Sequence, residues 1–152
     1  MKKLIFSLML CVVFVAQVMA QTPPVDENGV ALGGYDVVAY FVSNPMEGST
    51  QYTALHNGAT YRFATANNRD AFKQNPTKYL PQFDGYCAWG VAAKDAKFPI
   101  NPETYDIIDG KLYLFFNGPF NGKTFNSSLL WNQETTKLQT AAHDKWSEVK
   151  SK

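Results

Sequence analysis

The chain has 152 residues, with 14 lysine and arginine residues against 13 aspartate and glutamate residues, and its formal net charge is +1. This length is typical of one domain, and a charge so close to zero argues against binding to nucleic acid or to anionic membranes, which requires a basic surface. Aromatic residues make up 14% of the chain, which is ample material for a hydrophobic core because each ring can bury about 150–250 Å².

Residues 1–20 are typical of an export signal. Lys2 and Lys3 precede an apolar stretch over residues 4–16, and Val18-Met19-Ala20 has the small residues of a cleavage site. The apolar stretch is shorter than the roughly 20 residues that span a bilayer. We therefore expect cleavage after residue 20 and a bacterial protein that is periplasmic or secreted, with no membrane insertion after the signal is removed. The loss of two basic residues would leave 12 basic and 13 acidic residues.

Residues 21–34 are rich in proline and glycine, which predicts a flexible N-terminal arm. From Tyr35 onward the apolar density rises and no second linker interrupts it. We therefore expect a single domain over residues 35–152.

Asn57-Gly58 lies between two β-prone runs and predicts a hairpin with a two-residue turn, since both turn residues need a positive φ. The predicted pairs are His56 with Ala59, Ala54 with Tyr61 and Tyr52 with Phe63. Alternation places all six residues on one, largely aromatic face. His56 should therefore point toward the core, near its rim.

The next stretch, TANNRDAFKQNPTKYL, predicts a helix. Thr65 is a plausible N-cap, Phe72 is the expected buried anchor, and Asn75-Pro76 should end the helix before one further turn.

Asp109-Gly110 predicts a second hairpin of the same kind. The expected pairs are Ile108 with Lys111, Ile107 with Leu112 and Tyr105 with Leu114. Tyr113 and Phe115 point to the opposite face, so we expect that face to be partly covered as well.

Near the C-terminus, apolar residues recur at steps of three and four, which predicts one amphipathic helix from about Ser128 to Val149. The order of elements predicts an α+β fold, with a small antiparallel sheet built from two hairpins and helices packed on it.

Three stretches carry a resemblance to a known family: ALGGYDVVAYF at residues 31–41, HNGATYRFATANNRDAFKQNPTKYLPQF at 56–83, and DGYCAWGVA at 84–92. Together they resemble the YHS domain family, in its exported, single-domain branch. YHS domains also occur attached to copper-transporting ATPases and some oxygenase components, and cysteines in them are suspected metal ligands. The corresponding positions, within 35–40, at 64–65 and within 67–69, hold no cysteine in this chain.

Cys87 is the only cysteine outside the predicted export signal. Its apolar neighbours Ala88, Trp89 and Val91 favour ordinary core packing. No lysine or arginine lies within six residues to activate it as a nucleophile. A thiolate together with an imidazole would suit Cu(I) or Zn(II), and His56 is the candidate partner. His143 is expected in solvent, at the edge of the C-terminal helix.

No short-spaced metal motif, nucleophile elbow, phosphate loop or dinucleotide fingerprint is present in the sequence. We therefore predict a binding or accessory module rather than an enzyme, with no catalytic residue assigned. The leading hypothesis is binding of a soft transition metal, copper or zinc, by Cys87 and His56. The alternative is a small apolar or planar ligand in an aromatic-lined pocket, and a thiol-dependent enzyme comes third. The rings expected to line that pocket are Tyr35, Tyr40, Phe41, Tyr52, Tyr61, Phe63, Tyr86 and Trp89.

Overall fold

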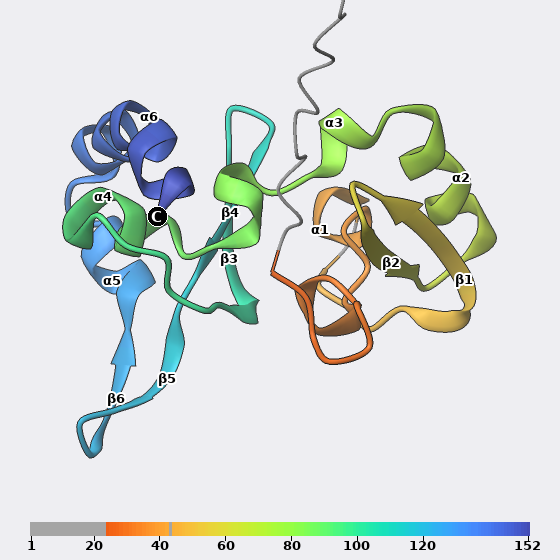
Figure 1. Ribbon diagram of the computed structural model, residues 1–152, viewed down its shortest axis with the longest axis horizontal. Helices are drawn as coiled ribbons and strands as arrows, with labels where there is room; N and C mark the ends of the chain where they lie inside the picture. The colour runs from red at the N-terminus through yellow and green to blue at the C-terminus, as the bar shows by residue number, and fades with distance from the viewer. Residues whose placement is uncertain (1–23, 43) are drawn as a thin grey trace, which may run out of the picture.

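The computed structural model describes residues 24–42 and 44–152, so the predicted export signal lies outside the described residues. The elements, in chain order (Figure 1), are η1 (Leu32–Gly34), α1 (Ala39–Val42), β1 (Ser49–His56), β2 (Ala59–Phe63), α2 (Ala66–Gln74), α3 (Pro76–Tyr79), η2 (Gln82–Gly85), α4 (Ala88–Lys94), β3 (Asn101–Ile108), β4 (Lys111–Phe115), β5 (Asn117–Phe120), β6 (Lys123–Asn126), α5 (Ser127–Trp131) and α6 (Thr135–Ser151). Among these described helices, none combines the length and apolar character needed to cross a membrane.

The α+β fold predicted from the sequence is confirmed. The strands of the described chain form three antiparallel hairpins, β1–β2, β3–β4 and β5–β6, each a separate two-stranded sheet. The first two hairpins were predicted from the sequence, and the third was not. Its turn is Asn121-Gly122, with φ values of 50° and 76°, which is the same local signal as at the other two turns.

The β1–β2 register agrees with the prediction next to the turn and departs from it further away. His56 pairs with Ala59 and Ala54 with Tyr61, as expected. The predicted pairing of Tyr52 with Phe63 is wrong, because a bulge shifts the register and brings Ser49 opposite Phe63. At the start of the strand, Gly48 lies so close to the backbone of Arg62 that no Cβ would fit there.

The predicted α2 helix is confirmed together with its N-cap and its end. The Thr65 side chain accepts a hydrogen bond from the Asn68 backbone N–H at 3.1 Å. Phe72 is buried in the core. The helix ends before Pro76, and one further turn, α3, follows.

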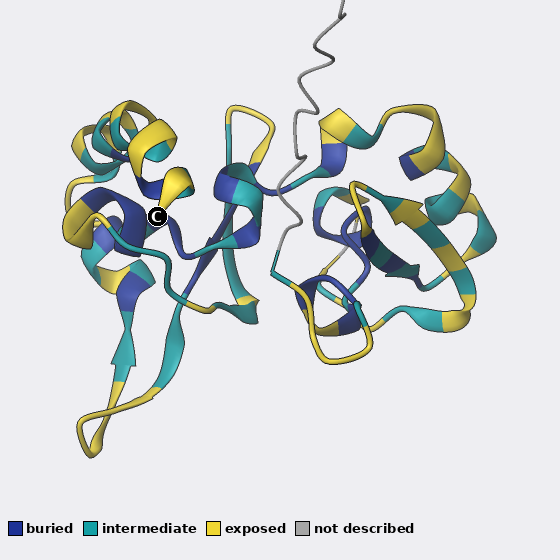
Figure 2. Cartoon of the chain, viewed as in Figure 1, coloured by how far each residue is buried: buried dark blue, intermediate teal, exposed yellow. Residues whose placement is uncertain are grey.

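Strand β4 divides the hydrophobic core into two clusters. Its four consecutive residues from Leu112 to Phe115 are all fully buried. Leu112 and Leu114 belong to the first cluster, with residues of α1, β2, α2 and α3. Tyr113 and Phe115 belong to the second cluster, with residues of α4, α5 and α6. The predicted covering of both faces of this hairpin is therefore confirmed, and the hairpin lies between the two halves of the molecule (Figures 1 and 2).

The C-terminal region forms two helices, so the prediction of one continuous helix over 128–149 is wrong. After α5, tight turns interrupt the helical ladder: Gln133 N donates to Leu130 O at 3.3 Å and Glu134 N donates to Trp131 O at 3.2 Å. The interruption leaves Trp131 fully buried against Phe115, with ring centroids 5.3 Å apart. The predicted apolar stripe holds along α6 alone, with Ala142 and Val149 buried.

The prediction of a flexible arm over residues 21–34 is wrong for its described C-terminal part. Val30, Ala31 and Leu32 are buried. Ala31 N donates to Thr60 O at 3.0 Å, and Thr60 N donates to Gly29 O at 2.9 Å. An exposed strand edge offers unpaired backbone groups, and this segment satisfies those of β2 while its apolar side chains fill the first cluster. The packed domain therefore begins before residue 35.

The buried carboxylate of Asp36 links the start of α1 to the start of α2. Its Oδ1 accepts hydrogen bonds from the backbone N–H groups of Val38 and Ala39, at 2.9 and 3.3 Å. Its Oδ2 accepts from Ala64 N at 2.8 Å and from Asn68 Nδ2 at 2.7 Å. Because every one of these contacts satisfies a donor within the fold, Asp36 has a structural role.

Candidate functional site

Cys87 is the N-cap residue of α4 and is fully buried. Its Sγ accepts a hydrogen bond from Gly90 N at 3.4 Å and lies 3.3 Å from Ser127 Oγ. Ser127 Oγ in turn donates its proton to Phe116 O at 3.0 Å. Because the serine hydroxyl has one proton, the Cys87 thiol is the donor to Ser127. The sulfur therefore joins α4 to the start of α5 through hydrogen bonds.

His56 lies in the other half of the molecule, at the end of β1. As predicted, it is half-buried on the apolar face of the hairpin, with its ring 5.6 Å from that of Phe72 and 6.4 Å from that of Tyr61. Both of these rings belong to the first cluster.

The structure does not bring Cys87 and His56 together. In Figure 1 the β1–β2 hairpin and α4 lie on opposite sides of the β3–β4 hairpin. Within the part of the chain that the structure describes, no group of three or more His, Cys, Asp and Glu residues is arranged to hold a metal ion.

The other histidine considered in the sequence, His143, is exposed on α6, as expected. It also contacts the second cluster. Its Nε2 lies 3.0 Å from the hydroxyl of Tyr113. Gln139 Nε2 donates to the same hydroxyl at 2.8 Å. The centroid of the His143 ring lies 5.1 Å from that of Phe83. Burial lowers the pKa of His143, and the nearby charge of Lys111 lowers it further.

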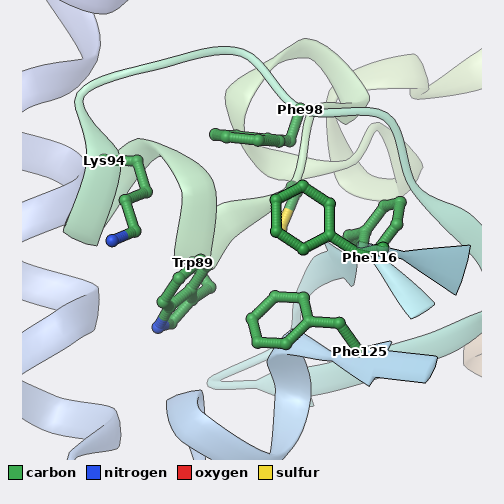
Figure 3. A pocket seen from close by; sticks show the side chains of 7 residues that line it. Trp89, Lys94, Phe98, Phe116 and Phe125 are labelled. Atoms are coloured by element: carbon green, nitrogen blue, oxygen red, sulfur yellow. The ribbon is translucent and has the colours of Figure 1, made fainter. Parts of the chain in front are cut away.

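A cavity of about 240 Å³ lies beside Cys87 and is lined almost entirely by aromatic rings (Figure 3). We call it the aromatic pocket. Cys87 lines it together with Trp89, Lys94, Phe98, Phe116, Phe120 and Phe125.

Phe125 on β6 connects the walls of the aromatic pocket. Its ring centroid lies 5.3 Å from that of Trp89, in an edge-to-face arrangement. The rings of Phe116 and Phe120 lie 6.2 and 6.0 Å from it. Its cross-strand partner on β5 is Gly118, and the Phe116 ring lies over this glycine, 3.6 Å from where a Cβ would be.

The position of Phe98 depends on two features of α4. Phe98 O accepts a hydrogen bond from Cys87 N at 3.1 Å, which holds the backbone of the loop. Gly90 leaves room for the ring, because a Cβ at this position would lie 2.6 Å from Phe98 Cδ2. A glycine inside a helix costs about 1 kcal/mol relative to alanine, and here it allows the ring to form one wall of the pocket.

The aromatic pocket lies elsewhere than the sequence analysis predicted. Of the eight rings named there, Trp89 is the one that lines it. Tyr40, Tyr61 and Phe63 are instead buried in the first cluster. The missed signal is the run FFNGPFNGKTF at residues 115–125, in which a turn at Asn121-Gly122 brings Phe120 and Phe125 near each other.

The aromatic pocket has a basic residue in its lining, Lys94, and a paired acidic residue next to it in sequence. Lys94 Nζ lies 5.4 Å from the centroid of the Trp89 ring. The next residue, Asp95, forms an ion pair with Lys145 at 2.7 Å, and the hydrogen bond from Lys145 lowers the pKa of the Asp95 carboxyl. Among the described residues that line the pocket there is no carboxylate.

A comparison with protein-family models, with curated proteins and with solved structures finds no significant match to this chain. The resemblance to the YHS domain family therefore stays a prediction from the sequence.

Proposed function

We propose that this chain is an exported, YHS-type accessory protein that binds a small apolar or planar ligand in the aromatic pocket. The observation that carries the proposal is the cavity of about 240 Å³ walled by Trp89 and four phenylalanine rings. Ligand pockets are typically concave and mostly apolar, with few polar groups that set orientation.

The size and lining of the cavity support a ligand rather than solvent. Protein interiors are close-packed and contain few voids larger than a water molecule. An apolar cavity of about 150 Å³ is large enough to bind benzene, and the aromatic pocket is larger. Phe120 is 52% exposed beside it, so a bound planar molecule would also cover apolar surface that now faces water.

The two other functions considered from the sequence have weaker support. Binding of copper or zinc by Cys87 and His56 needs both side chains at one ion, and they belong to separate halves of the molecule. Reactive cysteines are partly exposed in electropositive surroundings, whereas Cys87 is fully buried and its thiol proton is used in a hydrogen bond to Ser127.

The proposal is tested by calorimetric titration of the mature protein with 2-naphthalenemethanol, a neutral planar probe. We expect saturable binding to the wild type and binding about two- to tenfold weaker in Phe125→Ala, since an aromatic pair contributes about 0.5–1.5 kcal/mol beyond its buried area. The matched control is Phe41→Ala, which removes a half-buried ring that packs on Tyr79 in the first cluster.

The control variant should bind the probe as the wild type does. Thermal unfolding of each variant verifies that it is folded at the titration temperature. The proposal fails if the folded wild type shows no saturable binding, or if Phe41→Ala weakens binding as much as Phe125→Ala.

A further inference from the structure

We propose that the natural ligand of the aromatic pocket carries an anionic group, a carboxylate or a sulfonate, that pairs with Lys94. This inference rests on the proposed function, because it specifies the chemical class of the molecule bound there. The ligand would be an aromatic acid, with its ring against Trp89 and Phe125 and its anion at the end of the pocket where Lys94 lies.

The first support is the place of Lys94. This residue is in the last turn of α4, and Figure 3 shows its side chain next to Trp89, at one end of the group of rings. Among the described residues that line the pocket, it is the only charged one. A ligand whose ring enters the cavity would therefore have its polar end within reach of one cation.

The second support is that the carboxylate adjacent to Lys94 in sequence is already paired. Asp95, the residue after Lys94, is bonded to Lys145 at 2.7 Å. Within the part of the chain that the structure describes, Lys94 has no ion-pair partner. An anionic ligand would supply the missing counter-charge, whereas a cationic ligand would meet an uncompensated ammonium group.

Lys94 also has a role that needs no ligand. A lysine stem can cover apolar surface while its ammonium group stays in water, and its position over the Trp89 ring is a cation–π contact, 5.4 Å from the centroid. That role affects stability and gives no preference for the charge of a ligand. Charge selectivity therefore separates the two roles.

The test compares three probes that share one ring system: 2-naphthoate, 2-naphthalenemethanol and 2-naphthylmethylammonium. Each is titrated calorimetrically into the wild type, Lys94→Gln and Lys73→Gln. Lys73 is the matched control because it is also exposed in the last turn of a helix, α2, in the other half of the molecule.

For the wild type we expect 2-naphthoate to bind about three- to tenfold more tightly than the alcohol, since a partly exposed charge pair is worth only a modest free energy. The ammonium probe should bind most weakly. The preference for the acid should disappear in Lys94→Gln, persist in Lys73→Gln, and shrink at higher ionic strength because salt screens exposed charges.

The possible failures are distinct. If the alcohol and 2-naphthoate bind the wild type equally, the pocket binds planar ligands but the assignment of an anion is wrong. If the acid is still preferred in Lys94→Gln, the role of Lys94 is wrong. If none of the three probes binds, the proposed function itself fails.

Discussion

Substitution of Gly90 tests how α4 and Phe98 form the pocket wall, because it has two opposing effects on the free energy of unfolding. Replacing glycine by alanine inside a helix normally stabilises it by about 1 kcal/mol. At Gly90, however, the new Cβ would lie 2.6 Å from Phe98 Cδ2 and 3.2 Å from Phe98 Cβ. Overpacking of this kind costs about 1–3 kcal/mol.

The Phe98 ring cannot move away freely, because the Cys87 N to Phe98 O hydrogen bond holds its backbone. We therefore expect Gly90→Ala to lower the free energy of unfolding by up to about 2 kcal/mol, which is the difference between the two effects. In a Phe98→Ala background the 2.6 Å contact with the ring is gone and only the 3.2 Å contact with Phe98 Cβ remains. The same substitution should therefore be about 1 kcal/mol or more less destabilising there than in the wild type. The effect of Gly90→Ala on the free energy of unfolding should thus differ between the two backgrounds.

Urea denaturation of the four proteins in this double-mutant cycle, followed by circular dichroism, measures both effects. Gly90→Ala should also weaken binding of 2-naphthalenemethanol, since the new methyl group presses on Phe98, which lines the aromatic pocket. If Gly90→Ala stabilises the protein equally in both backgrounds, the Phe98 ring does not pack on Gly90 and the described pocket wall is wrong.

Two further predictions concern the second half of the molecule. His143 Nε2 lies 3.0 Å from the Tyr113 hydroxyl, and partial burial lowers the pKa of this histidine below its usual 6.5. The unfolded chain therefore binds more protons than the folded protein, and stability should fall as pH falls through 6.5. His143→Gln should flatten this slope in denaturation midpoints measured between pH 5 and 8, and an unchanged slope would refute the reasoning. Cys87→Ser should destabilise less than Cys87→Ala, because serine can still cap Gly90 N and bond to Ser127; urea midpoints in the reverse order would contradict this and indicate that the site is only a packed core.

The Cys87 prediction depends on a tertiary contact that the local sequence does not show. Beside Ala88 and Trp89, a buried serine hydroxyl would be expected to lack a partner. The fold supplies one from Ser127, which is 40 residues away in sequence. Local sequence describes the apolar surroundings of a thiol but not the polar group that packing brings to it.

Features set by neighbouring residues were predictable from the sequence. Asn57-Gly58 and Asp109-Gly110 made their turns and set the register beside them, because few residues tolerate a positive φ at both turn positions. Thr65 capped α2 and Pro76 ended it, because caps and prolines act on the backbone within one helical turn. The α+β class followed from the order of these elements.

The tertiary structure alone decided how the buried residues are divided. Periodicity indicates that Leu112 and Tyr113 point to opposite faces, but not that each face has its own cluster, with His56 in one half and Cys87 in the other. The aromatic pocket has the same origin, since its walls come from α4, the loop at Phe98 and the β5–β6 hairpin. Contacts of this kind depend on the packing of segments far apart in the chain, because side-chain periodicity gives the direction of a residue but not the partner that it meets.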